Sequence, residues 1–364
     1  MYDYLIVGAG LFGATFANLA FKKGKKCIVI DKRTHVAGNA HTKNIDGIDV
    51  HMYGPHIFNT KNEEVWRYVN KFCTMNEYWH LVKANHKGKL YSLPFNLNTF
   101  QELWGCNTPE EAKFLIEQKR ILISNPQNLE EKALSLVGEE IYEKFIYGYT
   151  KKQWMCEPRE LPASIIERIP FKFEFNNRYH DSIYSGIPNE GYTEMVRNML
   201  LGVRVELSVD FLLDKEKWLK VAEKTIYTGA IDQFYNYKYG ELGYRTLKFE
   251  SQTLNQENYQ GVSQVNFTDM ETPYTRIVEH KHFNPKPNNK TIITHEYPIE
   301  WQKGAVPYYP INNSQNNEIY NKYKEESKKD INVLIRGRLG QYVYIDMDQT
   351  IAMAMNTAKE EQLC

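Results

Sequence analysis

A glycine-rich turn between two short apolar segments at the N-terminus constrains this chain more than any other feature. Residues 4–7 (Tyr-Leu-Ile-Val) and 27–30 (Cys-Ile-Val-Ile) are typical of buried parallel strands. A G-x-G-x-x-G pattern over residues 8–13 opens an amphipathic segment between them. Strand, glycine turn, helix and strand in this order predict a βαβ unit that binds a dinucleotide.

Each glycine of this pattern has its own physical task. Gly8 permits the tight turn, Gly10 lets the backbone approach a pyrophosphate, and Gly13 lets the helix pack closely on the strand. The helix that includes Phe12 offers free N–H groups to the phosphates. Asp31 ends the second strand, 18 residues after Gly13, and is expected to accept a hydrogen bond from a ribose hydroxyl.

The residues after Asp31 bear on the type of dinucleotide. Lys32 and Arg33 could indicate the 2′-phosphate of NADP, whereas Gly38 and Asn39 are typical of a backbone that passes close beneath a large cofactor. A disulfide-reductase-type flavoenzyme would carry a second G-x-G-x-x-G and often a C-x-x-C, and the sequence has neither. The pattern therefore favours one FAD and no separate NAD(P) domain.

Composition excludes several classes of protein. Lys and Arg total 45 and Asp and Glu total 45, so no net field attracts nucleic acid or a membrane surface. The sequence contains no run of 18 apolar residues, so we expect no membrane span. Its N-terminus does not resemble a signal peptide. Five widely spaced cysteines favour reduced thiols in a cytoplasm over a disulfide framework or a metal site.

The two ends of the chain look nucleotide-binding, and the middle looks inserted. Residues 225–229 read as a buried strand that ends at Gly229, and residues 333–335 read as another, followed by Arg338 and a final helix over 349–360. We therefore predict an α/β fold: a Rossmann-like FAD-binding domain, a helical inserted domain and an antiparallel β-sheet domain. The predicted ranges are 1–75, 190–235 and 325–364 for the first, 98–152 for the second, and 76–97, 153–189 and 236–324 for the third.

Short motifs along most of the chain resemble those of one family, the bacterial UDP-galactopyranose mutases. They occur in the family's order, and they span roughly residues 1–355. The matching segments are residues 1–14, 31–33, 38–39, 53–58 (Tyr-Gly-Pro-His-Ile-Phe), 93–100 (Leu-Pro-Phe-Asn-Leu-Asn-Thr-Phe), 148–154 (Gly-Tyr-Thr-Lys-Lys-Gln-Trp), 168–170 (Arg-Ile-Pro), 273–276 (Pro-Tyr-Thr-Arg), 307–310 (Pro-Tyr-Tyr-Pro) and 346–347 (Asp-Met).

The resemblance implies an isomerase that interconverts the pyranose and furanose forms of UDP-galactose, the furanose serving cell-surface polysaccharides. It implies reduced FAD, whose N5 forms a covalent iminium with the sugar while UDP leaves and returns. It also implies a homodimer. UDP-N-acetylgalactosamine or UDP-arabinose are further possible substrates.

The resemblance also implies roles for individual residues. Arg168 and Arg276 correspond to two arginines that grip the substrate diphosphate, where a guanidinium stabilises the leaving charge. His56 corresponds to a histidine whose backbone carbonyl faces the flavin. The implied substrate-binding residues are Phe145, Tyr149, Trp154, Tyr179, Asn266, Tyr309, Tyr344, His80 and Asn59. The implied cofactor-binding residues are Gly8, Gly10, Phe12, Gly13, Asp31, Lys32, Gly38, Asn39, His56, Gly229, Arg338, Asp346 and Met347.

Two of these residues also carry an argument from spacing. Phe145 and Tyr149 are four residues apart in a segment predicted as helical, so they are expected to share a face of that helix.

Two other positions depart from the family's pattern. Asn59 stands where many relatives carry His or another residue, close to the expected sugar. Met155 stands where Gly is common. These departures bear on the identity of the sugar and on the stiffness of the segment after Trp154.

Two other classes of function stay open. An amine-oxidase-like FAD oxidoreductase on the same scaffold would oxidise its substrate and release hydrogen peroxide. A binding module without flavin would be colourless when purified. The mutase hypothesis predicts a flavin spectrum and no net oxidation.

Overall fold

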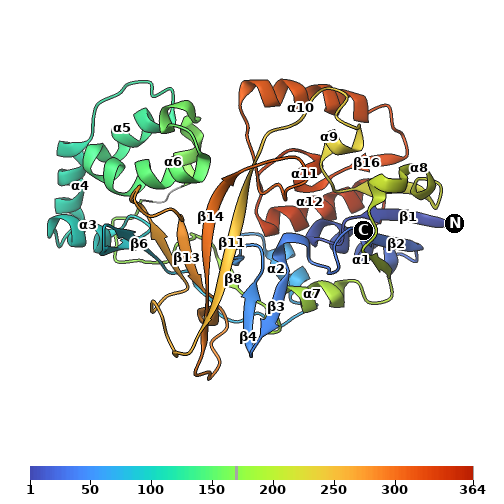
Figure 1. The fold of residues 1–364 in the computed structure, drawn as a ribbon, viewed down its shortest axis with the longest axis horizontal. Helices are drawn as coiled ribbons and strands as arrows, with labels where there is room; N and C mark the ends of the chain where they lie inside the picture. Colours follow the sequence, from blue (N-terminus) through green and yellow to red (C-terminus); the bar gives the residue numbers. More distant parts are fainter. Residues whose placement is uncertain (169–170, 364) are drawn as a thin grey trace.

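A computed structural model describes residues 1–168 and 171–363, without the side chains of residues 167 and 168 (Figure 1). A parallel sheet forms the nucleotide-binding part, with the order β16-β10-β1-β2-β9. Its strands are β1 (Tyr2–Val7), β2 (Cys27–Asp31), β9 (Arg204–Leu207), β10 (Ala222–Tyr227) and β16 (Val333–Ile335). The predicted βαβ unit is confirmed, because α1 (Leu11–Lys22) connects β1 to β2, which pair in parallel.

The two faces of this sheet are buried by different helices because successive side chains of a strand point to opposite sides. Tyr4 and Ile6 of β1 pack with α1, α7 (Gly191–Met199) and α12 (Met347–Glu360). Leu5, between them, packs on the opposite side with α9 (Ile231–Phe234) and α10 (Ser314–Ser327). Burial on both faces explains why these strands read as continuous apolar runs.

A second, seven-stranded sheet has the order β15-β11-β14-β13-β12-β6-β7. Its pairs are antiparallel except β12 with β6, which run parallel, so the predicted antiparallel sheet is mixed at this one place. The strands are β6 (Val82–His86), β7 (Lys89–Leu93), β11 (Tyr244–Leu254), β12 (Gln264–Phe267), β13 (Arg276–Glu279), β14 (Thr291–Glu300) and β15 (Tyr309–Pro310). In Figure 1 its long strands lie between the helical part and the parallel sheet.

The helical part comprises α3 (Leu97–Trp104), α4 (Pro109–Lys119), α5 (Leu129–Ile141) and α6 (Gly148–Trp154). The predicted helix starts are confirmed, since Thr108 and Asn128 cap α4 and α5 with side-chain hydrogen bonds. Between α5 and α6 lies a π-helical segment, Tyr142–Tyr147, in which the helix is wider. That segment rotates the residues after it relative to those before it.

The remaining elements connect these parts. Two small two-stranded sheets pair β3 (Thr42–Ile45) with β4 (Ile48–His51) and β5 (Phe58–Thr60) with β8 (Tyr184–Gly186). The short helices are α2 (Glu63–Val69), α8 (Lys215–Trp218) and α11 (Gly337–Gly340). Within the residues described, none of the helices combines the length and apolarity needed to cross a bilayer.

Packing differs from two of the predicted domain limits. Leu161 and Ile166 are buried in the core of the helical part, so that part extends past residue 152. The predicted sheet domain includes residues 314–324, most of helix α10, but the fully buried Tyr323 of this helix packs in the hydrophobic cluster beneath β1 and β2. Both differences arise from long-range packing, which short sequence patterns do not encode.

Candidate active site

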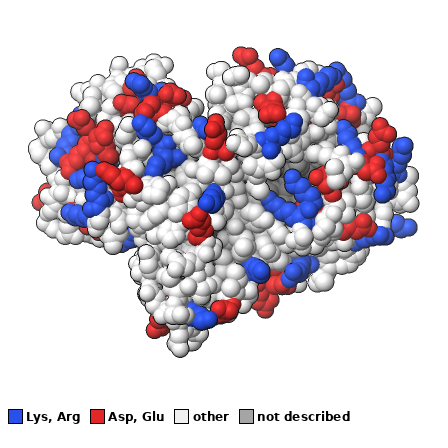
Figure 2. Space-filling view, viewed as in Figure 1, with Lys and Arg blue, Asp and Glu red and all other residues white. Residues whose placement is uncertain are grey.

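One cleft of about 590 Å³ runs from the carboxyl end of the parallel sheet to the seven-stranded sheet. The ends of β1, β2 and β10 open into it, as expected for a ligand site in an open parallel sheet. Figure 2 shows the opening as a hollow bordered by basic side chains. Four cationic side chains line it, those of Lys32, Arg33, Arg276 and Arg338, and so do four carboxylates, those of Asp31, Asp210, Glu296 and Asp346. An anion would therefore be held by individual guanidinium and N–H groups and not by a net positive field.

Close backbone approach shapes the end of the cleft beside the parallel sheet. Gly8 has φ +111°, and a Cβ there would overlap the Thr228 hydroxyl. A Cβ on Gly13 would overlap the carbonyl oxygen of Gly8, so the helix packs on the strand as the pattern predicts. A Cβ on Gly38 would lie 3.2 Å from the Cα of Gly10. The two loops therefore meet beneath the cleft with no room for side chains between them.

Helix α1 begins at this end without a side-chain cap. Its N-cap is Gly10, which leaves the first N–H groups directed at the cleft. Asp31 lines the cleft, and its carboxylate accepts hydrogen bonds from the backbone N–H of Ala9 and of Arg33, each at 2.8 Å. The Arg33 guanidinium donates to Asn39 at 2.8 Å. These bonds hold the two loops at fixed positions beside the helix terminus.

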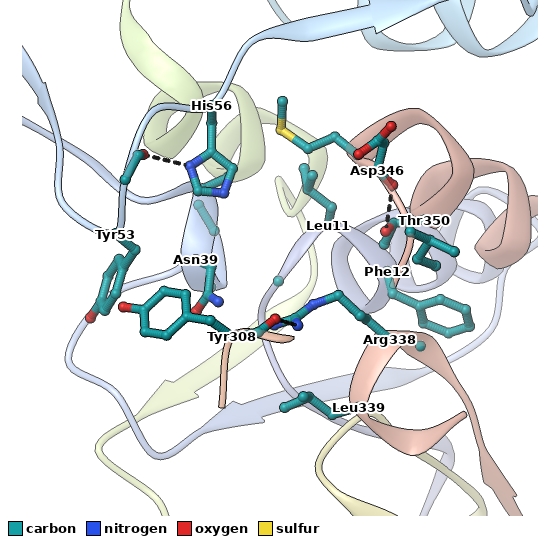
Figure 3. A pocket seen from close by; sticks show the side chains of 18 of the residues that line it. Leu11, Phe12, Asn39, Tyr53, His56, Tyr308, Arg338, Leu339, Asp346 and Thr350 are labelled. Atoms are coloured by element: carbon teal, nitrogen blue, oxygen red, sulfur yellow. Dashed lines mark hydrogen bonds between the residues drawn. The ribbon is translucent and has the colours of Figure 1, made fainter. Parts of the chain in front are cut away.

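Arg338, Asp346 and His56 border the cavity from three different segments (Figure 3). Arg338 is half-buried and donates hydrogen bonds to the carbonyl oxygens of Pro307 and Tyr308. Burial lowers its pKa. Asp346 caps α12 through a capping box, so the N-terminus of α12 also opens into the cleft with Met347 beside it. Gly229, at the end of β10, lines the same region.

A chain of neutral imidazoles holds the segment that carries His56. The His56 ring donates from Nδ1 to the Gly54 carbonyl at 2.8 Å, and its backbone N–H donates to Nδ1 of His51 at 3.0 Å. The backbone N–H of His51 donates in turn to Nδ1 of His280 at 3.2 Å. Burial lowers the pKa of His56 to about 4 and that of His280 to about 3. All three rings are therefore uncharged near neutral pH, and the hydrogen bonds determine their tautomers.

The opposite end of the cleft is built from side chains. Arg276 of β13 and Glu296 of β14 are cross-strand partners, with Nε and Oε1 3.1 Å apart; the Glu296 side chain is buried and that of Arg276 is 16% exposed. Burial opposes the charge of Arg276, but the Glu296 carboxylate raises its pKa. Burial raises the pKa of Glu296, although Arg276 opposes that shift. A largely buried guanidinium with N–H groups left for a ligand is suited to hold an anion.

Tyrosine side chains surround this ion pair. Tyr149 of α6, Tyr179, Tyr309 and Tyr344 all line the cleft. The rings of Tyr309 and Tyr344 are 5.5 Å apart. Burial raises the pKa of Tyr149 to about 12 and raises the pKa of Tyr179 and of Tyr309. These phenols keep their protons and can donate hydrogen bonds to phosphate oxygens.

A row of amide and imidazole groups completes this end. The Gln264 amide donates to Asn266 Oδ1 at 2.8 Å, which leaves the Asn266 NH₂ group as a donor. His80 lies beside Gln264, and burial lowers its pKa to about 3. Its ring stacks on that of His180, with centroids 6.0 Å apart. All four residues and Asn59 line the cleft.

Most of the predicted site residues meet in this cleft, and a few lie elsewhere. Phe145 is buried in the helical part, with its ring centroid 5.0 Å from that of Tyr91 and 5.6 Å from that of Phe95. Phe145 lies within the π-helical segment and Tyr149 just after it, and of the two only Tyr149 lines the cleft. Trp154 ends α6, 6.4 Å from the Tyr309 ring. The side chain of Arg168 lies outside the described part of the chain.

The structure adds residues that the sequence patterns did not indicate. Glu296, Gln264, His180, Thr228 and Tyr308 also line the cleft. Glu296 lies 20 positions after Arg276, and only the register of β13 against β14 brings the two together. A carboxylate in the middle of a predicted β-rich stretch was the one available signal.

Comparison with known proteins agrees with this geometry. A profile described as UDP-galactopyranose mutase matches residues 144–344, and one for an NAD(P)-binding Rossmann-like domain matches residues 6–72. An Escherichia coli dTDP-fucopyranose mutase is 41% identical, covering 99% of this chain and 98% of the relative. A probable UDP-galactopyranose mutase of Klebsiella pneumoniae is also 41% identical, over 98% of this chain and 94% of that relative. In fold, the chain resembles the crystal structure of a reduced UDP-galactopyranose mutase, with a TM-score of 0.73 and 12% sequence identity. The match covers 100% of this chain and 94% of the other.

Proposed function

Because the chain belongs to the UDP-galactopyranose mutase family, we propose that it interconverts the pyranose and furanose forms of a nucleotide-linked sugar. UDP-galactose is the first candidate substrate. One observation carries the proposal: a dinucleotide-binding turn and a largely buried Arg276–Glu296 pair ringed by tyrosines share a single cleft. A cofactor and a diphosphate-linked sugar could thus meet inside it.

FAD is the cofactor that we propose for the end beside the parallel sheet. The glycine turn has no room for side chains, the α1 terminus presents open N–H groups, and Arg338 supplies positive charge. Asp31, Lys32 and Asn39 line this end of the cleft, and Asp31 and Lys32 would bind the ribose. When bound and reduced, FAD supplies the electron-rich nitrogen that can attack an anomeric carbon. The N-terminus of α12, at Asp346 and Met347, favours negative charge on a reduced ring.

At the other end, Arg276 holds the diphosphate. When the bond from the anomeric carbon to the phosphate oxygen breaks, negative charge grows on the departing nucleotide, and a guanidinium stabilises it without losing a proton. Tyr179, Tyr309 and Tyr344 donate from neutral phenols. Arg168 is the second proposed arginine. Phe145 and Trp154 are proposed to act behind Tyr149 and beside Tyr309, enclosing the base and excluding water.

His56 is proposed to act mainly through its backbone. Its ring donates to the Gly54 carbonyl and its N–H donates to His51, and these bonds would hold its backbone carbonyl in place beside a bound cofactor. Changing the ring is then milder than changing the path of the backbone at Gly54, which has φ +90°.

A dTDP-linked sugar is a second candidate substrate for the same type of reaction. The 41% identical dTDP-fucopyranose mutase favours a dTDP-linked sugar as strongly as the other relative favours a UDP-linked one. Asn59, His80 and His180 are proposed to contact the sugar, since they line the same cleft as Arg276. Neutral amide and imidazole groups bind hydroxyls, whichever sugar is bound.

The experiment uses the purified protein in oxidised and dithionite-reduced forms. We expect a flavin spectrum, and chromatography should show the reduced form converting UDP-galactofuranose to UDP-galactopyranose or interconverting the dTDP-fucose isomers, with no hydrogen peroxide. A colourless protein contradicts the FAD proposal. Peroxide formation would indicate the oxidase alternative. The mutase proposal is contradicted if the reduced enzyme converts neither UDP-galactofuranose nor the dTDP-fucose isomers, and also fails on UDP-N-acetylgalactosamine and UDP-arabinose.

We also propose a cytoplasmic homodimer. The four internal cysteines, Cys27, Cys73, Cys106 and Cys156, are free thiols. Phe114 and Leu122 of the helical part are 63% and 83% exposed, which supports a contact between two chains there. Light scattering of the wild type and of Phe114→Glu tests this: a monomeric wild type contradicts it.

A further inference from the structure

Helix α6 and the turn between β12 and β13 are joined at two points one helical turn apart. A Cβ on Gly148 would overlap the carbonyl oxygen of Thr268, so helix and turn approach as closely as backbones can. Four residues later, the Lys152 ammonium reaches into the same turn. It donates to three backbone carbonyl oxygens, those of Phe267 at 2.8 Å, Thr272 at 2.9 Å and Tyr274 at 3.1 Å.

This contact uses the full donor capacity of a lysine. An ammonium has three N–H bonds, and each of the three meets one carbonyl of the turn. Burial lowers the pKa of Lys152 to about 8, while the carboxylates of Asp269 and Glu271 favour its charge. The side chain therefore keeps its charge at neutral pH, and the turn depends on that charge for three of its acceptors.

Both partners in this joint carry residues of the cleft. Tyr149 directly follows Gly148 on α6 and lines the cleft. Asn266 directly precedes Phe267 on β12, and Arg276 follows Tyr274 by two residues at the start of β13. A displacement of α6 relative to the turn would thus separate Tyr149 from Asn266 and Arg276.

We propose that Lys152 is a positioning residue, which holds α6 against the β12–β13 turn so that Tyr149, Asn266 and Arg276 contact the same nucleoside diphosphate. The proposal rests on the function proposed above, and it assigns to Lys152 no contact with the substrate. Its contribution is to nucleotide affinity, because the parts that it joins are those of the anion end of the cleft.

The chain offers a matched control in the preceding residue. Lys151 lies on the same helix, and its ammonium pairs with Glu157 at 2.6 Å and with the Tyr147 hydroxyl at 3.1 Å. Those partners belong to the helical part itself. Lys151→Met therefore removes a lysine and its ion pair from α6 without touching the joint.

The experiment measures the dissociation constant of UDP for the FAD-loaded protein by calorimetry, with dTDP as a second probe. We expect Lys152→Met to weaken binding roughly tenfold, because three hydrogen bonds to a charged donor are lost. We expect Lys151→Met to stay within about twofold of wild type and Lys152→Arg to recover most of the loss. At saturating sugar substrate, kcat of Lys152→Met should stay within about threefold, so that the change falls on KM.

A double-mutant cycle tests whether Lys152 acts through the turn. Asn266→Ala should weaken UDP binding less in the Lys152→Met background than in wild type, because Asn266 is then already displaced. Equal effects of Asn266→Ala in both backgrounds, or equal affinities of Lys152→Met and Lys151→Met, would overturn the proposal. If Lys152→Met does not fold, Gly148→Ala displaces the same joint at its other point and should also weaken binding; unchanged affinity there counts against the proposal. A wild type that binds neither UDP nor dTDP overturns the proposed function as well, whereas binding that Lys152 does not affect overturns this inference alone.

Discussion

The two ends of the cleft are built in different ways. The end beside the parallel sheet consists of backbone and glycines, most of them within residues 8–39. The opposite end consists of side chains from α6, β12, β13, β14 and the segments around Tyr179, Tyr309 and Tyr344. The first end is therefore specified by a short stretch of sequence. The second depends on contacts between segments more than a hundred residues apart, such as Lys152 with the β12–β13 turn.

The largest expected effect comes from a side chain placed in the glycine turn. Gly13→Val puts a Cβ onto the carbonyl oxygen of Gly8, which forces α1 away from β1. We expect a loss of more than about 3 kcal/mol in the free energy of unfolding, together with loss of flavin. Urea denaturation and flavin absorbance measure both. Gly24→Ala is the comparison: a Cβ there meets no atom within 4 Å, and only its φ of +77° opposes the side chain, at a cost of about 1 kcal/mol. Stability of Gly13→Val equal to that of Gly24→Ala would refute the close-packing argument.

Arg276→Ala tests the other end. Losing the guanidinium removes the main stabilisation proposed for the departing diphosphate, so kcat/KM should fall about 10²- to 10³-fold. Flavin should stay bound, because Arg276 lies at the end of the cleft opposite the glycine turn. Steady-state kinetics and the flavin-to-protein ratio separate the two effects. Glu296→Gln serves as a comparison, since it removes the partner charge and keeps the arginine; unchanged kcat/KM in Arg276→Ala would reject the assigned role.

The same contrast explains which parts of the fold could be predicted. The βαβ unit, the starts of α4 and α5 and the final helix follow from signals a few residues apart, and the structure confirms them. The parallel pairing of β12 with β6 and the packing of α10 under the parallel sheet depend on the whole fold. No short pattern contains that information.

The candidate site divides along the same line. Gly8, Gly10 and Asp31 were predicted from spacing alone and line the cleft. Glu296 was missed because its meaning depends on the strand register that places it opposite Arg276. Phe145 was expected to reach the cleft with Tyr149, but it lies within the π-helical segment and packs in the core of the helical part, so of the two only Tyr149 lines the cleft.

The pH dependence of stability tests whether Glu279 holds β13, the strand that begins with Arg276, in place. Glu279, at the other end of β13, is buried and accepts hydrogen bonds from the backbone N–H groups of Tyr259 and Gln260 and from the Thr291 hydroxyl. Burial opposes its charge, but His282 and these donors together lower its pKa from 4.5 to about 2. A lowered carboxyl pKa stabilises the fold above the unfolded-state value and loses that effect as the pH falls from about 4.5 to about 2.

We therefore expect stability to decrease by about 3 kcal/mol across that range from this group. Glu279→Gln should be less stable near neutral pH and should show a smaller decrease on acidification. Urea denaturation at a series of pH values measures both. Identical pH profiles for the wild type and Glu279→Gln would mean that Glu279 is not an anchor of β13.

The smallest expected effect lies at the end of α6, where Trp154 is followed by Met155 with φ +52°. Most residues with a Cβ lose about 1 kcal/mol in this left-handed conformation, while Asn tolerates it and keeps an ordinary unfolded-state entropy. Met155 is 47% exposed, so its side chain contributes little packing. We expect Met155→Asn to raise the free energy of unfolding by about 0.5 kcal/mol and Met155→Val to lower it by about 1 kcal/mol. Thermal denaturation of the two variants decides the sign. Turnover should be unchanged in Met155→Asn, because the helix that places Tyr149 ends in the same conformation; a loss of turnover without loss of stability would show that Met155 itself takes part in the substrate end of the cleft.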